Sequence, residues 1–325
     1  MKTKHNKDVE ICSPRKQLYL YGYENYFNSF MKLYEKNKFP NSILLSGPKG
    51  LGKATFAYHF ANYLLSQKEE GEYSVKTSSI NGNNISYKLI NANTHPNFFL
   101  IESNFQGSDI KIEQIRNLVN FLNKTSYKKN LKIVMIDNSE YLNLNSSNAL
   151  LKSIEEPPSN TFFFIIHNSA LKILDTIKSR CCEFKISFTL TQKKNILTKI
   201  IDQYGNEFQT NSIIEDFYFD SPGNLIKYFL SLDKANINIK ENLLNCIIHF
   251  IDQYKANKSL ETLTFITLFV QKFYNELCLN NNKNLNNYII NQSQILRQIN
   301  NIKKFNLDEK NVFIWVKNIL QNEKK

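Results

Sequence analysis

A glycine-rich loop between an apolar run and a helical pattern constrains this sequence more than any other feature. The apolar run 42–46 suits a buried parallel strand, and the loop 47–55, GPKGLGKAT, follows it directly. Its spacing is that of a P-loop, in which backbone N–H groups and a helix N-terminus bind phosphate and a lysine neutralises its charge. Residues 41–62 are therefore predicted to form a strand, a phosphate loop and a helix, with these candidate nucleotide-binding residues: Gly47, Gly50, Gly52, Lys53 and Thr55.

One position of the motif departs from the pattern. Ala54 stands where a P-loop has the hydroxyl that holds Mg²⁺. Thr55 is the next residue, but it is rotated by about 100° around the helix. The loop therefore predicts a phosphate-binding fold without predicting magnesium-dependent hydrolysis.

A second motif lies at the end of an apolar run over residues 132–136, which leads into Asp137. Ligands of open α/β sheets bind at the carboxyl ends of the strands, so this carboxylate would face the phosphate loop, as in a Walker B strand. Hydrolysis needs a second acid directly after it to orient water, and Asn138 is a neutral amide. Taken alone, the segment favours a buried strand with an N-capping aspartate; the P-loop upstream reverses that preference.

Strands and helices alternate along this part of the chain. Further strands are predicted at 98–102 and 162–166, and helices at 23–34, 112–122 and 145–154. Asn168 follows the last strand and is a candidate nucleotide sensor. Residues 66–93 are rich in Ser, Asn, Lys and Glu and predict a solvent-facing excursion, and His95 before Pro96 predicts a turn rather than a catalytic site. The alternation predicts a doubly wound parallel sheet.

Composition excludes several classes of protein. With 325 residues, 42% of them hydrophobic, the chain can bury a large core in two or three domains. No window approaches the roughly 20 apolar residues of a membrane span, and the N-terminus lacks a signal core, which predicts a cytoplasmic protein. The five cysteines are scattered, which predicts neither disulfides nor zinc. The net charge of +12 permits contact with nucleic acid, but a composition rich in Lys, Asn and Ile is the favoured explanation.

Four segments in order resemble the AAA+ subunits of the bacterial sliding-clamp loader of DNA polymerase III. They are the loop 47–55, the strand 132–137, the sequence SNALLKSIEEPP at 147–158, and TIKSRC at 176–181. The likeness covers about residues 15–230. It implies an α/β P-loop (AAA+) domain with a parallel sheet, a small helical lid and an all-α collar. The expected boundaries are a disordered N-terminus at 1–14, the AAA+ domain at 15–186, the lid at 187–231 and the collar at 232–325.

The resemblance also implies a role for Arg180 and a set of partners. The SRC arginine of the family reaches the ATP bound by a neighbouring motor subunit, and a guanidinium supplied in trans can raise phosphoryl transfer by about 10³- to 10⁵-fold. The alternative for Arg180 is a surface salt bridge. Implied partners are the gamma/tau and delta subunits, the sliding clamp, and primer-template DNA through a hetero-oligomeric complex, a component of the polymerase holoenzyme; no membrane is involved.

Departures from the family pattern argue against turnover by this chain. Ala54, Asn138 and Asn224 replace the magnesium hydroxyl, the catalytic acid and a sensor arginine. Residues 66–93 lack the four zinc cysteines of many relatives, so no zinc or other required cofactor is predicted, although the retained loop leaves weak ATP or ADP binding open. The alternative is a self-sufficient motor-type ATPase (gamma/tau), which would need Thr55 and Glu140 as substitutes. A nucleic-acid-binding protein without nucleotide chemistry is a third hypothesis.

Overall fold

The computed structural model describes residues 12–103, 108–124, 131–204, 220–235, 237, 242–280, 284–305 and 309–323. Its contacts divide the chain into two units, Met1–Ile226 and Lys227–Lys325, and each is described by itself. The finer division into three domains stays a prediction. Most of the predicted N-terminal tail, residues 1–11, lies outside the described residues.

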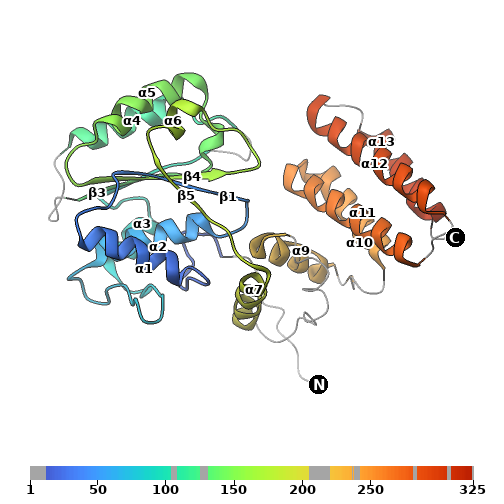
Figure 1. Cartoon of the computed structure of the whole chain (residues 1–325), viewed down its shortest axis with the longest axis horizontal. Helices are drawn as coiled ribbons and strands as arrows, with labels where there is room; N and C mark the ends of the chain where they lie inside the picture. The colour runs from blue at the N-terminus through green and yellow to red at the C-terminus, as the bar shows by residue number, and fades with distance from the viewer. Residues whose placement is uncertain are drawn as a thin grey trace. The chain divides into compact units, whose positions relative to one another are not determined.

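A five-stranded parallel sheet forms the centre of the first unit (Figure 1). Its order is β2-β3-β4-β1-β5, and every neighbouring pair is parallel. The strands are β1 (Ser42–Gly47), β2 (Phe98–Ile101), β3 (Lys132–Ile136), β4 (Thr161–Asn168) and β5 (Cys182–Lys185). The predicted α/β P-loop fold with a parallel sheet is confirmed.

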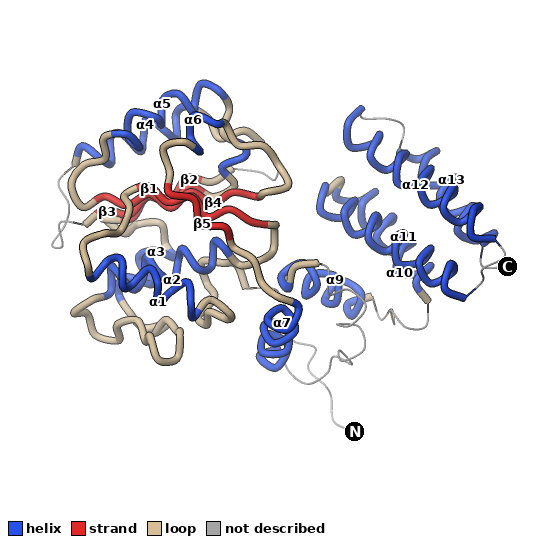
Figure 2. Tube along the Cα trace, viewed as in Figure 1, coloured by secondary structure: helices blue, strands red, loops and turns tan. Residues whose placement is uncertain are grey.

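Helices cover both faces of this sheet (Figures 1 and 2). On one face lie α1 (Glu24–Glu35), α2 (Lys53–Ser66) and α3 (Ile85–Asn91); on the other lie α4 (Ile112–Asn123), α5 (Leu144–Glu155) and α6 (Asp175–Lys178). The short 3-10 helix η1 (Ser139–Tyr141) follows β3, and α7 (Leu190–Tyr204) follows β5.

Alternate residues of each central strand enter different hydrophobic cores, because successive side chains of a strand point to opposite faces. Ile43 and Leu45 pack into the core beneath α1 and α2, whereas Leu44 between them belongs to the core beneath α4 and α5. Phe164 and Phe163 divide in the same way. The strands are buried on both sides, which is why the sequence shows them as unbroken apolar runs.

The prediction of a solvent-facing excursion at residues 66–93 is wrong. This segment contains α3 and buries Tyr73 and Ile80 in the core beneath α2. Polar groups of the segment also bind one another: the carboxylate of Glu69 accepts hydrogen bonds from Ser86 Oγ at 2.8 Å and from Asn84 Nδ2 at 3.1 Å. The polar composition gave no sign of this packing, because these buried polar side chains hydrogen-bond to one another.

The second unit consists of helices in its described part (Figure 2). Helix α9 (Pro222–Lys234) runs through the division between the units. It is followed by α10 (Leu243–Asn257), α11 (Leu260–Asn280), α12 (Leu285–Phe305) and α13 (Glu309–Glu323). An aromatic cluster in its core joins Tyr228, Phe250, Phe265 and Phe269. The predicted all-α C-terminal part is confirmed. None of the helices described here is long and apolar enough to span a membrane.

Candidate functional site

The phosphate loop joins the end of β1 to the start of α2. Gly50 and Gly52 have φ angles of 83° and 86°, a left-handed conformation that residues with a Cβ rarely adopt. These turns bring the helix N-terminus to the carboxyl end of the strand, as the sequence predicts. Thr55 lies in the first turn of α2 and is half-buried.

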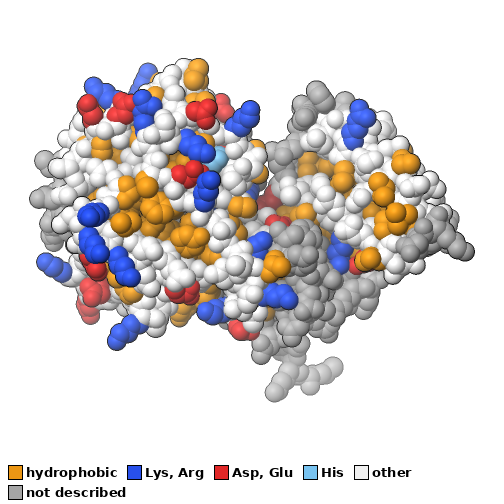
Figure 3. All heavy atoms as spheres, viewed as in Figure 1, with side chains coloured by type: hydrophobic (Ala, Val, Ile, Leu, Met, Phe, Trp, Pro, Cys, Tyr) orange, Lys and Arg blue, Asp and Glu red, His pale blue; other side chains and the backbone are white. Residues whose placement is uncertain are grey.

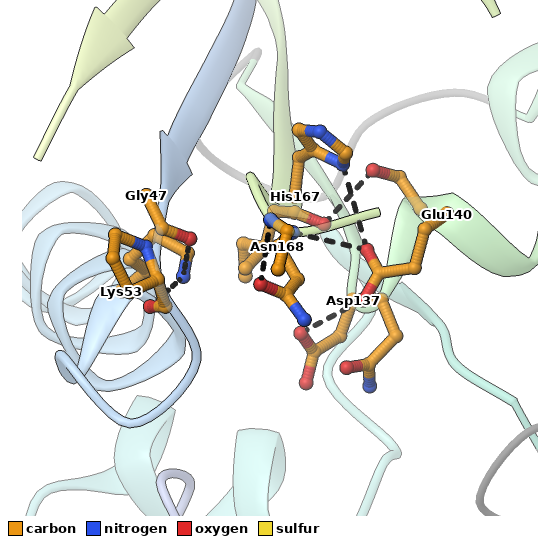
Figure 4. A network of polar contacts seen from close by, with 11 residues as sticks. Gly47, Lys53, Asp137, Glu140, His167 and Asn168 are labelled. Atoms are coloured by element: carbon orange, nitrogen blue, oxygen red, sulfur yellow. Dashed lines mark hydrogen bonds and ion pairs between the residues drawn. The ribbon is translucent and has the colours of Figure 1, made fainter. Parts of the chain in front are cut away.

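The lysine of the loop is turned back onto the loop itself. Lys53 Nζ donates to the carbonyl oxygens of Gly47 and Pro48, both at 2.7 Å, and the residue is 5% exposed (Figure 4). Burial lowers the pKa of Lys53 to about 8, although Glu140 and Asp137 oppose the shift. The amine is therefore still mostly protonated at neutral pH, and its hydrogen bonds are made to backbone carbonyls.

The other candidate nucleotide-binding residues lie at the same edge of the sheet. Because β4 lies between β3 and β1, Asn168 at the end of β4 stands between the phosphate loop and Asp137, and it pairs in register with Gly47. Asn168 Oδ1 accepts a hydrogen bond from Ala170 N at 3.2 Å. The structure thus places four residues named from the sequence at one edge: Gly47, Lys53, Asp137 and Asn168 (Figure 4).

Asp137 is half-buried at the end of β3. Desolvation raises the pKa of its carboxyl to about 6, and the hydrogen bond from Asn138 N–H to Oδ1, at 2.9 Å, opposes the shift. Asn138 itself has a φ of 54°, a left-handed conformation that asparagine tolerates better than most residues. The chain turns sharply here into η1.

Glu140 makes contacts that sequence reasoning did not predict. Its carboxylate is 4% exposed, accepts a hydrogen bond from Asn168 N–H at 3.1 Å, and lies 3.6 Å from His167 Nδ1 (Figure 4). Burial alone would raise the pKa of Glu140, but His167 and the backbone N–H groups outweigh it, and the pKa is lowered. Glu140 thus ties the turn after β3 to the end of β4, and its carboxylate is already engaged.

A second segment of the same unit packs against the phosphate loop. Gly223 N–H donates to the carbonyl oxygen of Gly50 at 3.0 Å. A Cβ at Gly50 would collide with Ser221 Oγ and lie 2.8 Å from Asn224 Oδ1. Asn224, which stands where the resemblance implies a sensor arginine, is therefore adjacent to the loop, and Nδ2 of Asn224 donates to Asp220 at 3.0 Å.

Arg180 lies at the other end of the sheet. It precedes β5, whose first residue Cys182 pairs with Ile43 near the start of β1, whereas the phosphate loop begins at the end of β1. Four residues of strand, at about 3.3 Å each, separate Ile43 from Gly47, which is roughly 13 Å. The side chain is 36% exposed and forms an ion pair with Glu155.

His95 has the geometry of a structural residue. Its Nδ1 accepts the backbone N–H of Asn97 at 3.1 Å, so Nε2 carries the proton in the neutral ring. Nε2 lies 3.3 Å from Ser86 Oγ and has no lone pair to take a proton from it. Ser86 and His95 therefore do not form a nucleophile and base. Among the described residues, no three His, Cys, Asp or Glu side chains gather where they could hold a metal ion.

The described basic side chains of the first unit form no single patch on the face seen in Figure 3. On the face seen in Figure 3, the described Lys and Arg side chains of the first unit are interspersed with Asp and Glu. This face therefore adds no support for the nucleic-acid hypothesis to that of the net charge.

These features define a P-loop protein with a parallel α/β sheet. Residues 22–189 match the model of a family described as DNA polymerase III, delta subunit. Three relatives are similar in sequence. DNA polymerase III subunit delta' of Pseudomonas aeruginosa is 36% identical over 143 residues, which cover 44% of this chain and 42% of the relative. Subunit delta' of Buchnera aphidicola (Schizaphis graminum) is 28% identical over 286 residues, with coverages of 78% and 84%. Subunit gamma of the same Buchnera is 31% identical over 209 residues, with coverages of 62% and 55%.

The chain therefore belongs to the delta-prime family of DNA polymerase III subunits, which are AAA+ subunits of the sliding-clamp loader. The match spans about half of the Pseudomonas delta' and Buchnera gamma relatives and most of the Buchnera delta' relative.

Proposed function

We propose that this chain is a subunit of a clamp loader that does not hydrolyse ATP and supplies Arg180 to ATP bound by a neighbouring motor subunit. The observation that carries the proposal is the position of Arg180. It lies at the amino end of the strand pair β1–β5, and its own phosphate loop lies at the carboxyl end. An arginine at that distance acts on another subunit's nucleotide more readily than on its own.

The arrangement of the chain's own loop supports the absence of turnover. The alternative, a self-sufficient motor-type ATPase, needs Glu140 to orient water, but that carboxylate accepts the Asn168 N–H and lies beside His167. Ala54 offers no hydroxyl for magnesium, and Asn138 cannot accept a proton. Residues 221–224 pack against Gly50, which is where the phosphates of a bound nucleotide would approach.

The partners in this proposal are those that the family membership suggests: gamma/tau and delta subunits, the sliding clamp, and primer-template DNA reached through the complex. No cofactor and no zinc are required. Weak binding of ATP or ADP by Gly47, Gly52 and Lys53 remains compatible with the proposal, because it concerns hydrolysis rather than binding.

The test is reconstitution of the loader from this chain and its own partner subunits, followed by steady-state ATPase measurement with DNA and clamp present. Arg180→Ala should lower the ATPase by a factor of about 10³ at the site that it serves. Lys172→Ala, which removes an exposed positive charge eight positions earlier in the chain, should leave the rate unchanged. Undiminished ATPase with Arg180→Ala would overturn the proposal, as would turnover by the isolated chain that is lost in Lys53→Ala.

A further inference from the structure

The guanidinium of Arg180 is held on two sides within its own chain. Nε is paired with the carboxylate of Glu155, and Nη1 donates to the carbonyl oxygen of Thr176 at 3.0 Å. Within the described chain, Nη2 has no hydrogen-bond acceptor. Glu155 is the last residue of α5 and Thr176 lies in α6, so two helices hold the side chain beside the start of β5.

This pose competes with phosphate binding. Arginine binds phosphate best through two parallel N–H groups, which are either Nε with Nη2 or Nη1 with Nη2. In each pair one nitrogen already has a partner in this chain. Release from Glu155 frees Nε, so that Nε and Nη2 can together bind a phosphate. A phosphate fits these two N–H groups with the same bidentate geometry as a carboxylate does.

We propose that Glu155 is a counter-ion that competes with the terminal phosphate of ATP for Arg180. It holds the arginine withdrawn and is displaced when the neighbouring subunit presents its nucleotide. This inference rests on the proposed function of Arg180, and Glu155 acts through Arg180 rather than on the nucleotide. Both side chains are partly exposed, at 36% and 44%, so the competition is graded rather than all-or-none.

The test compares variants of Glu155 in the reconstituted loader by measuring the ATPase rate at a series of ATP concentrations. Glu155→Gln keeps the shape but removes the charge that opposes phosphate, so the KM for ATP should fall about two- to fivefold, the range expected for an exposed ion pair, with kcat unchanged. Glu155→Asp keeps the charge and should remain near wild type. The neighbouring carboxylate Glu156 makes no contact with Arg180, and Glu156→Gln is the matched control.

A double variant separates this effect from a structural one. In an Arg180→Ala background, Glu155→Gln should change the KM no further, because the group that it competes for is gone. A KM for Glu155→Gln equal to that of Glu156→Gln would overturn the proposal, and so would a fall in kcat with the KM unchanged. If Arg180→Ala alone leaves the ATPase intact, the proposed function fails and this inference fails with it; a normal loss in Arg180→Ala with no effect of Glu155→Gln overturns only the counter-ion.

Discussion

Asp137 is a carboxylate whose ionisation is costly in the folded chain. Its pKa is raised from 3.8 to about 6, chiefly by desolvation. The folded state therefore binds the proton more tightly than the unfolded state does. Ionisation of Asp137 lowers the free energy of unfolding by its full amount above pH 6, and this loss disappears as the pH falls toward 4.

Asp137→Asn should accordingly raise the free energy of unfolding by about 1–3 kcal/mol at pH 7.5, since asparagine can still accept the Asn138 N–H through Oδ1. The gain should shrink as the pH is lowered to 4, which urea unfolding at several pH values will measure. Asp202→Asn on the exposed side of α7 is the control and should change little. If Asp137→Asn is less stable than wild type at pH 7.5, the raised pKa of Asp137 is contradicted.

The residues of the site differ in how far the sequence could predict them. Gly47, Lys53 and Asp137 follow from local motifs at the ends of apolar runs, and the topology of a parallel sheet brings such ends together. The contact of Glu140 with His167 and Asn168 was not predicted, because it depends on how the turn after β3 packs against the end of β4. An acid in that turn and a histidine at the tip of a strand were the signals available.

At the scale of elements, Glu69 holds the start of α3 against the end of α2. Its carboxylate accepts from Ser86 Oγ, Ser86 N–H and Asn84 Nδ2, and both partner residues are about 1% exposed. Asn84 Nδ2 and Ser86 Oγ keep second acceptors in the carbonyl oxygens of Glu70 and Leu65, whereas the Ser86 N–H has Glu69 as its acceptor. Glu69→Ala should therefore lower the free energy of unfolding by about 1–2 kcal/mol, chiefly through the buried Ser86 N–H. Chemical denaturation will measure the loss. Glu70→Ala, next along the chain and exposed, should be near neutral.

The contact between the phosphate loop and α9 depends on a close approach of two backbones. A Cβ at Gly223 would lie 2.6 Å from the carbonyl oxygen of Gly50. Alanine is favoured over glycine in a helix by about 1 kcal/mol, but the overlap with fixed backbone outweighs this, so Gly223→Ala should destabilise the chain by about 1–3 kcal/mol. In the control, Gly82→Ala, the added Cβ meets no atom closer than 3.8 Å. Equal stability of the two variants in thermal unfolding would contradict the prediction and show that the phosphate loop shifts to accommodate the methyl group at little cost.

Over the whole molecule, strands β1 to β4 were predictable because each is an apolar run, and the longer helices of the first unit were predictable from their apolar spacing. The edge strand β5, with the sequence CEFK and partly exposed side chains, and the four-residue helix α6 were not predicted, because neither shows such a pattern. Residues 66–93 were also missed, because their buried polar groups give the segment the composition of a loop. In the second unit the helices follow from their periodicity, but the arrangement of their faces into one core does not, because a stripe says only which side is buried.

The sheet also decides which residues depend on one another. Phe163 and Phe164 are adjacent in the sequence, yet they contribute to cores on opposite faces. Phe164 shares its core with Phe39 and Phe60, more than 100 positions away. Energetic coupling follows shared packing rather than position in the sequence. The effects of substitutions at neighbouring positions of β4 should therefore add, whereas those at distant aromatic residues on one face should not, so an evolving sequence can change each core separately.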